Sequence, residues 1–189
     1  MNQIWQYWKG GIDPSLVDIL ISTGDSYPPD RPGMGFDGSI TNEKYRSSEV
    51  RWIPAGESKN KFIIDMFWKF AQEANKNAFG FDITYIDAVQ YTKYAATENG
   101  QYNWHYDTFW ANPTTQDRKL SIVIQLSDSA DYEGGDFQID PQLPQLPADE
   151  IRTKGTVLVF PSFISHRVTP VTKGTRRSLV CWVEGPKFR

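Results

Sequence analysis

Apolar residues repeat at three- and four-residue intervals in two stretches near the start of the chain, the spacing of an amphipathic helix. The first stretch begins at Asp13-Pro14, a favourable N-cap followed by proline at the first helical position, and its apolar positions are Leu16, Val17, Leu20 and Ile21. The second runs from about Lys59 to Ala78, with apolar side chains at Phe62, Ile63, Met66, Phe67, Phe70, Ala71 and Ala74. We therefore expect two helices. Between them, the Gly, Pro, Ser and Asp content of residues 22–42 predicts an irregular loop.

Beyond Gly80 the pattern changes to short runs that are rich in aromatic and β-branched residues and predict strands. These runs are Phe81–Tyr94, Trp104–Phe109, Lys119–Leu126, Gly135–Ile139, Thr156–Phe160, Ser165–Val168 and Arg176–Val183. Two more strands are predicted earlier in the chain, at Ile4–Trp8 and Ser48–Ile53. Many short strands separated by turn residues are typical of a β-sandwich or barrel.

The longest predicted strand, Phe81–Tyr94, has two different faces, because neighbouring side chains of a strand point to opposite sides. One face would carry Ile83, Tyr85, Val89 and Tyr91, and the other Ala88, Gln90, Thr92 and Tyr94. No internal repeat or composition break divides the chain. We expect a single domain over residues 1–189, in which helices within about 1–80 buttress a sheet core at about 81–185.

The bulk composition narrows the functional classes. A chain of 189 residues is long enough for one domain with a single core. A net charge of −3 and a pI near 5.4 provide no basic field for a nucleic-acid backbone, so no nucleic-acid partner is expected. The single cysteine, Cys181, excludes an internal disulfide framework and is typical of a reducing compartment. The sequence shows neither a signal peptide nor a membrane span, so we expect a cytoplasmic protein without a membrane partner.

His105 and Asp107 form an H-x-D pair within one predicted strand, so their side chains are expected on the same face. The chain has only two histidines, and the second, His166, lies in another predicted strand. Two histidines and one carboxylate, with three coordination positions left open, are the facial triad of non-haem Fe(II) oxygenases. The residues therefore predict a metal site at His105, Asp107 and His166.

The predicted strand that follows His166 adds a cation. Gly174 predicts a tight turn before it, and strand alternation places Arg176, Ser178, Val180 and Trp182 on one face. Arg176 can therefore point toward the metal ligands, and its planar guanidinium matches a carboxylate. Arg177 has the opposite parity, and we expect it to be solvated.

In this order, the motifs resemble the superfamily of 2-oxoglutarate- and Fe(II)-dependent oxygenases, and within it the prolyl 4-hydroxylase-like branch. The resemblance spans roughly residues 81–183, with a weaker echo at Arg46–Trp52. It rests on Gln90-Tyr91…Tyr94, Gly100…Tyr102…Trp104-His105-x-Asp107, Leu120-Ser121…Leu126-Ser127, Gly134-Gly135-Asp136-Phe137 and His166…Pro170-Val171…Gly174-x-Arg176…Trp182. The implied fold is mainly β with flanking helices: a cupin-like double-stranded β-helix, or jelly roll.

The resemblance also implies the ligands. The triad of His105, Asp107 and His166 would bind Fe(II), and 2-oxoglutarate would chelate the metal and place its distal carboxylate on Arg176. One coordination position would remain for O2, and ascorbate would be a supporting reductant. Tyr94 and Ser178 match positions that contact the cosubstrate in related enzymes.

The implied reaction is hydroxylation of an unactivated C–H bond with release of succinate and CO2. The prolyl 4-hydroxylase-like branch implies a prolyl residue of a protein or peptide as the substrate, and Tyr102, Trp104 and Trp182 are candidate walls of its cleft. Three alternatives stay open: hydroxylation of a free amino acid or other small molecule, dealkylation of nucleic acid, and a non-catalytic cupin-like binding module. The dealkylase branch has a second arginine where this chain has Trp182, and a binding module would be expected to have lost a metal ligand.

Substrate specificity is expected in the segments that connect the predicted elements, because loops on a rigid scaffold commonly carry function. The candidate segments are residues 22–42, 109–117 and the Pro-rich 140–150. The first is also predicted to be mobile without substrate and to close over the site as a lid, since such closure excludes water from the reaction. The sequence does not predict an oligomeric state.

Overall fold

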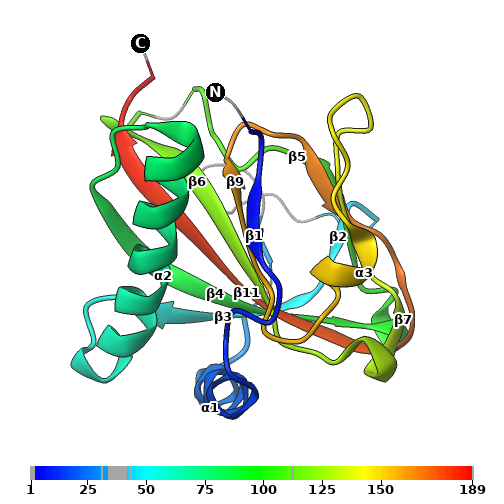
Figure 1. Cartoon of the computed structure of the whole chain (residues 1–189). Helices are drawn as coiled ribbons and strands as arrows, with labels where there is room; N and C mark the ends of the chain where they lie inside the picture. The colour runs from blue at the N-terminus through cyan, green and yellow to red at the C-terminus, as the bar shows by residue number, and fades with distance from the viewer. Residues whose placement is uncertain (1–2, 31, 34–41, 43, 112, 189) are drawn as a thin grey trace.

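The protein folds into two antiparallel β-sheets with the two long helices on one side, in a computed structural model that describes residues 3–30, 32–33, 42, 44–111 and 113–188 (Figure 1). The larger sheet has the order β1-β9-β6-β11-β4-β3, with β7 paired to β11. Its strands are β1 (Gln6–Trp8), β9 (Val157–Pro161), β6 (Gln116–Gln125), β11 (Val171–Pro186), β4 (Tyr85–Ala95), β3 (Glu49–Pro54) and β7 (Tyr132–Gly134). The smaller sheet has the order β2-β5-β10-β8, with β2 (Arg46–Ser47), β5 (Gln101–His105), β10 (His166–Val168) and β8 (Phe137–Ile139).

The two predicted helices are confirmed. Helix α1 (Pro14–Asp25) begins where expected, and the Asp13 carboxylate caps it by accepting a hydrogen bond of 2.9 Å from the backbone N–H of Ser15. Helix α2 (Lys61–Ala74) follows the single turn η1 (Ser58–Asn60) and continues into the π-helical turn η2 (Asn75–Phe79). Gly80 ends this run in the left-handed conformation, with φ +67°. The other short helices are η3 (Ala96–Glu98), η4 (Ser129–Asp131) and α3 (Ala148–Ile151).

Both long helices pack on the same face of the larger sheet and form the main core with it. Figure 1 shows α2 lying along the sheet, with α1 seen end-on below it. The apolar stripe of α2 buries Phe67, and β4 contributes Tyr91, which is fully buried. Gly24 of α1 lies so close to Tyr91 that a Cβ there would be 2.5 Å from the ring's Cγ atom. A side chain at position 24 would therefore push α1 off the sheet.

The opposite face of the larger sheet is turned toward the smaller sheet. Along β4, Val89 and Tyr91 belong to the helix-covered core, whereas Gln90 and Tyr94 line a cavity. The predicted alternation of faces is therefore confirmed for this part of the strand, and one strand separates the apolar core from the cavity.

The alternation fails at the start of β4, which begins at Tyr85 rather than at Phe81. Tyr85 was expected on the same face as Val89 and Tyr91, which is the core face in the structure, but it is 42% exposed, and Ile86 packs into the core instead. The cause is a register shift against β11: Cys181 pairs with Val89, whereas Val183 pairs with Ile86. Such an extra residue in one strand reverses the faces beyond it.

The predicted strands otherwise overlap observed ones, and β2 and β7 were not predicted. Gly174 is left-handed, with φ +70°, but it does not end a strand. It lies inside β11 and pairs with Tyr132 of β7, so the predicted tight turn is wrong. Of the predicted loop at 22–42, residues 22–25 belong to α1 and Asp30 forms a bridge with Val50, while 31, 34–41 and the predicted lid closure lie outside the described residues.

Within the described part of the chain, no helix combines the length and apolar character that crossing a membrane requires.

Candidate active site

A cavity of about 740 Å³ is lined by residues of both sheets. The sequence singled out nine site residues, and all nine line this cavity: Tyr94, Tyr102, Trp104, His105, Asp107, His166, Arg176, Ser178 and Trp182. Tyr106 also lines it and is 57% exposed, so the cavity is open to solvent on that side. The fold thus brings together every residue that the sequence predicted for the site.

The two histidines lie next to each other on neighbouring strands of the smaller sheet. His105 ends β5, His166 begins β10, and the two are directly paired in the antiparallel register, with ring centroids 4.1 Å apart. His105 Nδ1 lies 2.7 Å from the carbonyl oxygen of Asn103, and His166 Nδ1 lies 2.9 Å from that of Ile164. A carbonyl oxygen only accepts, so each Nδ1 carries the proton and each Nε2 keeps a lone pair for a metal.

Asp107 lies beyond the end of β5, so the expectation that it shares a strand with His105 is wrong. Its backbone N–H donates to the carbonyl oxygen of Ser162 at 2.9 Å, which holds the segment after the strand in place. The carboxylate oxygens lie 3.7 Å from His105 Nε2 and 3.4 Å from His166 Nε2. The three ligand atoms fall within 4.8 Å of one another, so the residues converge as predicted although the strand ends earlier.

Ser121 of β6 orients the Asp107 carboxylate. Its hydroxyl lies 2.6 Å from Asp107 Oδ2 and 2.9 Å from the hydroxyl of Ser162. Because a carboxylate only accepts, Ser121 donates its proton to Asp107 and accepts from Ser162. The carboxylate is thereby held by a buried hydrogen-bonded chain behind the cluster.

The protonation states suit metal binding. Burial, together with the neighbouring His166, lowers the pKa of His105 to about 3, so its imidazole is neutral at physiological pH. Burial alone would raise the pKa of Asp107, but electrostatic interactions with His166 and His105 outweigh it and lower the pKa to about 2. Two histidine imidazoles and one carboxylate are the donor set that non-haem Fe(II) oxygenases use, with coordination positions left open.

Arg176 and Tyr94 lie side by side in the same cavity. They are directly paired between β11 and β4, and the guanidinium carbon of Arg176 is 5.7 Å from the centroid of the Tyr94 ring. Arg176 is only 3% exposed, yet within the described residues its guanidinium forms no hydrogen bond or ion pair. Ser178 is the next residue on this face and is buried. A buried cation without an anion is costly, so this end of the cavity fits an anionic ligand.

Arg177 lies on the other face of β11, as its parity predicted, but it is not fully solvated. It is half-buried, and its Nε atom is buried without a hydrogen-bond partner in the described part of the chain. The expectation of a solvated side chain is therefore wrong, because Arg177 lies beside the buried Tyr91, with which it interacts electrostatically.

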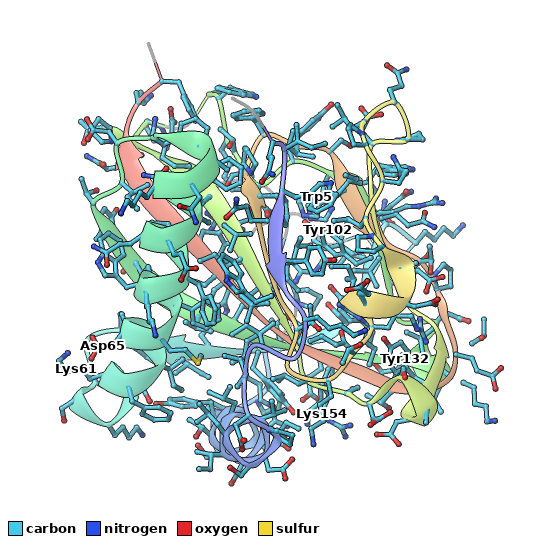
Figure 2. All side chains as sticks on the ribbon, viewed as in Figure 1. Trp5, Lys61, Asp65, Tyr102, Tyr132 and Lys154 are labelled. Atoms are coloured by element: carbon cyan, nitrogen blue, oxygen red, sulfur yellow. The ribbon has the colours of Figure 1, made fainter. Side chains whose placement is uncertain are left out.

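Tyr102, Trp104 and Trp182, the predicted aromatic walls of the cleft, each contact a different side chain. Tyr102 stacks on His105 with ring centroids 3.5 Å apart, and Figure 2 shows it in the space between the two sheets. The guanidinium of Arg167 lies over the Trp104 ring at 4.7 Å. Trp182 lies 6.1 Å from Trp52, which is 39% exposed.

Three cavity or supporting residues were not assigned a role from the sequence. Arg46 of β2 and Arg118 of β6 both line the cavity, and Ser121 holds Asp107. Arg46 belongs to the segment Arg46–Trp52, which resembles the family pattern more weakly, so this resemblance could have identified it as a site residue. The orientation of Arg118 depends on a register shift that the sequence does not reveal.

The segments predicted to set specificity contribute unequally. From residues 109–117, Phe109 lines the cavity; residue 112 lies outside the described residues. No residue of 140–150, all of which are described, is among those that line it.

Structures of known proteins share this fold. A prolyl-4-hydroxylase from Pseudomonas putida superposes with a TM-score of 0.73 at 18% identity, over 97% of this chain and 94% of that one. A prolyl hydroxylase from Trichoplax adhaerens, solved in complex with a hypoxia inducible factor oxygen degradation domain peptide fragment, gives 0.73 at 16% identity, over 95% and 83%. At such identities the likeness shows the fold alone, a double-stranded β-helix.

The sequence itself matches the model of the 2OG-Fe(II) oxygenase superfamily over residues 89–184. The chain belongs to this superfamily. A PKHD-type hydroxylase from Synechococcus sp. (strain CC9311) is 38% identical over 88 residues, which are 46% of this chain and 38% of that protein. The match to this relative therefore spans well under half of its length.

Proposed function

We propose that the protein is a Fe(II)- and 2-oxoglutarate-dependent dioxygenase that hydroxylates a prolyl residue of a polypeptide. The observation that carries the proposal is the convergence, in one cavity, of a two-histidine, one-carboxylate cluster with a buried arginine that has no anion among the described residues. Both features suit ligands that the superfamily uses.

His105, Asp107 and His166 would hold the iron. Their ligand atoms are already within 4.8 Å of one another, and both Nδ1 atoms are engaged with backbone carbonyl oxygens. This arrangement fixes the tautomer and the ring orientation before any metal arrives. Ser121 does the same for the carboxylate, which fits a preformed site rather than one that folds around the ion.

Arg176 would bind the distal carboxylate of 2-oxoglutarate. Its guanidinium can make two parallel charge-assisted hydrogen bonds, which a single lysine ammonium cannot. Ser178 and Tyr94 flank it on the same face and offer hydroxyl groups to the same ligand. Burial raises the pKa of Tyr94 above its ordinary value, so this phenol stays protonated and available as a donor.

Bound Fe(II) would supply the coupling of O2 reduction to oxidative decarboxylation of 2-oxoglutarate. One oxygen atom enters succinate and the other enters the substrate C–H bond, while carbon 1 of the cosubstrate leaves as CO2. The residues of the chain orient the two substrates and limit the access of water, as proteins do around a reactive cofactor.

The size and openness of the cavity favour a polypeptide substrate. A volume of about 740 Å³ exceeds what 2-oxoglutarate and a single amino acid need, and the exposed Tyr106 and Trp52 border its open side. The Trichoplax adhaerens prolyl hydroxylase, which shares the fold, was solved with a peptide. Trp182, Tyr102 and Trp104 offer flat surfaces against which a proline ring can pack.

The test is a coupled measurement of succinate release and substrate oxidation. The enzyme is supplied with Fe(II), 2-oxoglutarate and O2 and is presented with proline-containing peptides, free amino acids and oligonucleotides. We expect a gain of one oxygen on proline in at least one peptide, detected by tandem mass spectrometry, with an equal amount of succinate.

Efficient turnover of a free amino acid without reaction on any peptide would replace the polypeptide with a small-molecule substrate. Oxidation of oligonucleotides alone would favour the dealkylase alternative. If Fe(II) and 2-oxoglutarate do not bind at all, the enzyme proposal is overturned in favour of a binding module.

A further inference from the structure

The turn between β9 and β10 supports two of the three proposed metal ligands. It is closed by a hydrogen bond of 2.9 Å from the backbone N–H of Ile164 to the carbonyl oxygen of Pro161. The carbonyl oxygen of Ser162 accepts from the backbone N–H of Asp107 at 2.9 Å, and that of Ile164 accepts from Nδ1 of His166 at 2.9 Å. The position of this one turn therefore sets the positions of two ligands together.

The third proposed ligand is held independently of this turn. His105 Nδ1 donates to the carbonyl oxygen of Asn103, which lies in the same strand, β5. A shift of the turn would therefore move Asp107 and His166 relative to His105. Because a metal ion needs all of its protein ligands at bonding distance at once, such a shift would weaken its binding.

Phe163 lies between Ser162 and Ile164 in the turn, but it does not line the cavity. Its ring centroid is 6.2 Å from that of Phe81 and 5.8 Å from that of Phe188, and the rings of Phe81 and Phe188 are 5.6 Å apart. All three pairs meet edge to face, which is a favoured arrangement of aromatic rings. These three residues form an aromatic cluster that holds the middle of the turn.

Strand β6 connects the aromatic cluster to the turn by a second route. The backbone N–H of Phe188 donates to Asp117 Oδ2 at 2.8 Å, and the ammonium group of Lys119 lies 3.4 Å from the centroid of the Phe188 ring. Asp117 and Lys119 are both buried members of β6. The carbonyl oxygen of Lys119 accepts a hydrogen bond of 3.0 Å from the backbone N–H of Ser162. Phe188 and the turn are thus fixed to the same two turns of side chains on one strand.

Phe79 provides a contrast within the same region. It stacks on Phe81 with ring centroids 6.1 Å apart and is buried in the helix-covered core. Both Phe79 and Phe163 are described, and they make no ring contact with each other. Phe79 therefore contributes to the packing around Phe81 without contacting the turn.

We propose that Phe163 is a positioning residue of the metal site. The aromatic cluster holds the turn where the carbonyl oxygens of Ser162 and Ile164 place Asp107 and His166 for a shared metal ion. The inference rests on the metal site of the proposed function and extends it to side chains outside the cavity. Through Phe188, it also gives the segment after β11 a role in metal binding.

The test compares metal binding by the folded wild type with that of Phe163→Ala, Phe163→Leu, Phe188→Ala and Phe79→Ala. Equilibrium dialysis with Mn(II) gives the affinity, and urea unfolding gives the stability of each protein. The visible absorption of the Co(II)-loaded proteins reports the coordination geometry, which a purely structural role of Phe163 would not change. Phe79→Ala is the matched control, because it also removes a ring that contacts Phe81.

Phe163→Ala should bind Mn(II) about 10-fold more weakly than the wild type, the lower end of the range for groups that orient metal ligands. Its Co(II) absorption bands should shift. Phe163→Leu, which keeps an apolar side chain but loses the ring, should give an intermediate affinity. Phe188→Ala should weaken binding by a smaller factor, because Phe81 still contacts Phe163. Phe79→Ala should lower the urea midpoint and leave the Mn(II) affinity and the Co(II) spectrum unchanged.

The inference is overturned if folded Phe163→Ala keeps the Mn(II) affinity and the Co(II) spectrum of the wild type. It is also overturned if Phe79→Ala lowers the affinity as much as Phe163→Ala does, because the effect would then follow from stability. If Phe163→Ala does not fold, Phe163→Leu and Phe188→Ala decide: reduced Mn(II) affinity in either supports the inference, and wild-type affinity in both refutes it.

The same measurements separate this inference from the proposed function. A wild-type protein that binds no Mn(II) overturns both. A wild type that binds Mn(II) and hydroxylates a peptide, together with a Phe163→Ala variant of equal affinity, refutes only the role of Phe163. Weaker Mn(II) binding by Phe163→Ala without oxidation of any peptide by the wild type supports the positioning role and refutes the hydroxylase.

Discussion

The two faces of the larger sheet have opposite characters although they are built from the same strands. On one face, Tyr91 and Leu179 pack against helices in a continuous apolar core. On the other face, Gln90 and Tyr94 of β4 and Arg176 and Ser178 of β11 line the cavity, and Arg176 is directly paired to Tyr94. The parity of a residue therefore decides whether it serves stability or ligand binding.

The two faces differ in the chemical character of the side chains that they bury. The helix-covered face buries apolar side chains, which stabilises the fold in proportion to the area removed from water. The other face borders the cavity, where it buries Arg176 beside the histidines and the aspartate contributed by the smaller sheet and the segment after β5. Burying such polar groups without full partners among the described residues is unfavourable for folding. We expect substitutions on the two faces to separate into effects on stability and effects on ligands.

The largest expected effect is that of Asp107→Ala in the cavity. Loss of one of three ligands should reduce metal affinity and hydroxylation by about 1,000-fold or more, since even changes to groups that only support a ligand cost 10- to 100-fold. Folding should change little, because the substitution removes a buried charge rather than apolar contacts. Equilibrium dialysis with Mn(II) and urea unfolding measure the two quantities. A variant that keeps its metal affinity would show that Asp107 is not a metal ligand, and an unfolded variant would show that Asp107 also serves stability.

The matching change on the core face is Phe67→Ala. Phe67 is fully buried in the helix-covered core, so the variant should lose about 3–5 kcal/mol of unfolding free energy, as for other large-to-small core changes. At temperatures where it remains folded, its Mn(II) affinity should equal that of the wild type. Urea unfolding and dialysis on the same preparation provide the check.

Lys61→Ala is the control for helix α2. Lys61 forms an exposed i,i+4 ion pair with Asp65, and Figure 2 shows both side chains on the outer side of the helix. Such a pair contributes less than about 1 kcal/mol. A loss from Lys61→Ala as large as that from Phe67→Ala would mean that helix α2 itself, and not its buried face, determines stability.

The third effect compares neighbours on β11 that lie on opposite faces. Arg176→Ala should raise the KM for 2-oxoglutarate by about 100-fold, through loss of a bidentate charge-assisted contact. Arg177→Ala should leave this KM within about twofold, because its side chain lies on the helix-covered side of the sheet. Initial rates of succinate formation at varied 2-oxoglutarate decide it. Equal changes in KM for the two variants would show that the strand face of a residue does not determine whether it contacts the cosubstrate.

The sequence predicted a set of residues that come together in one cavity, but it predicted the strand geometry less well. His105 and His166 are the only histidines, and Arg176 shares parity with Ser178 and Trp182, so local pattern and residue chemistry were sufficient. The helices were predictable for a similar reason, because Asp13 and the apolar repeat of α2 act through neighbours in the chain.

Three of the misses share one physical cause. The faces of Tyr85 and Ile86, the orientation of Arg118 and the position of Gly174 inside β11 all depend on irregular pairing with a strand far away in sequence. A single extra residue in a ladder reverses every face beyond it. Alternation read along one strand cannot reveal where its partner introduces such a shift.

The smallest expected effects are those of two buried serines, one of which contacts a metal ligand and the other only the backbone. Ser121 donates to the Asp107 carboxylate at 2.6 Å, whereas Ser127, just after β6, donates to the Thr175 carbonyl oxygen at 3.2 Å and accepts from the Arg177 amide at 2.7 Å. Ser121→Ala should lower Mn(II) affinity by about 10-fold, the lower end for groups that orient a metal ligand.

Ser127→Ala should instead cost about 1 kcal/mol of unfolding free energy, the usual value of one lost hydrogen bond, and leave the Mn(II) affinity unchanged. Both variants remove one buried hydroxyl, so their difference isolates what that hydroxyl contacts. Dialysis and urea unfolding of both proteins give the result. If Ser121→Ala lowers stability but not Mn(II) affinity, the backbone contact to Ser162 is sufficient to orient the Asp107 carboxylate. The Ser121 hydroxyl would then serve the stability of the fold and not the metal site.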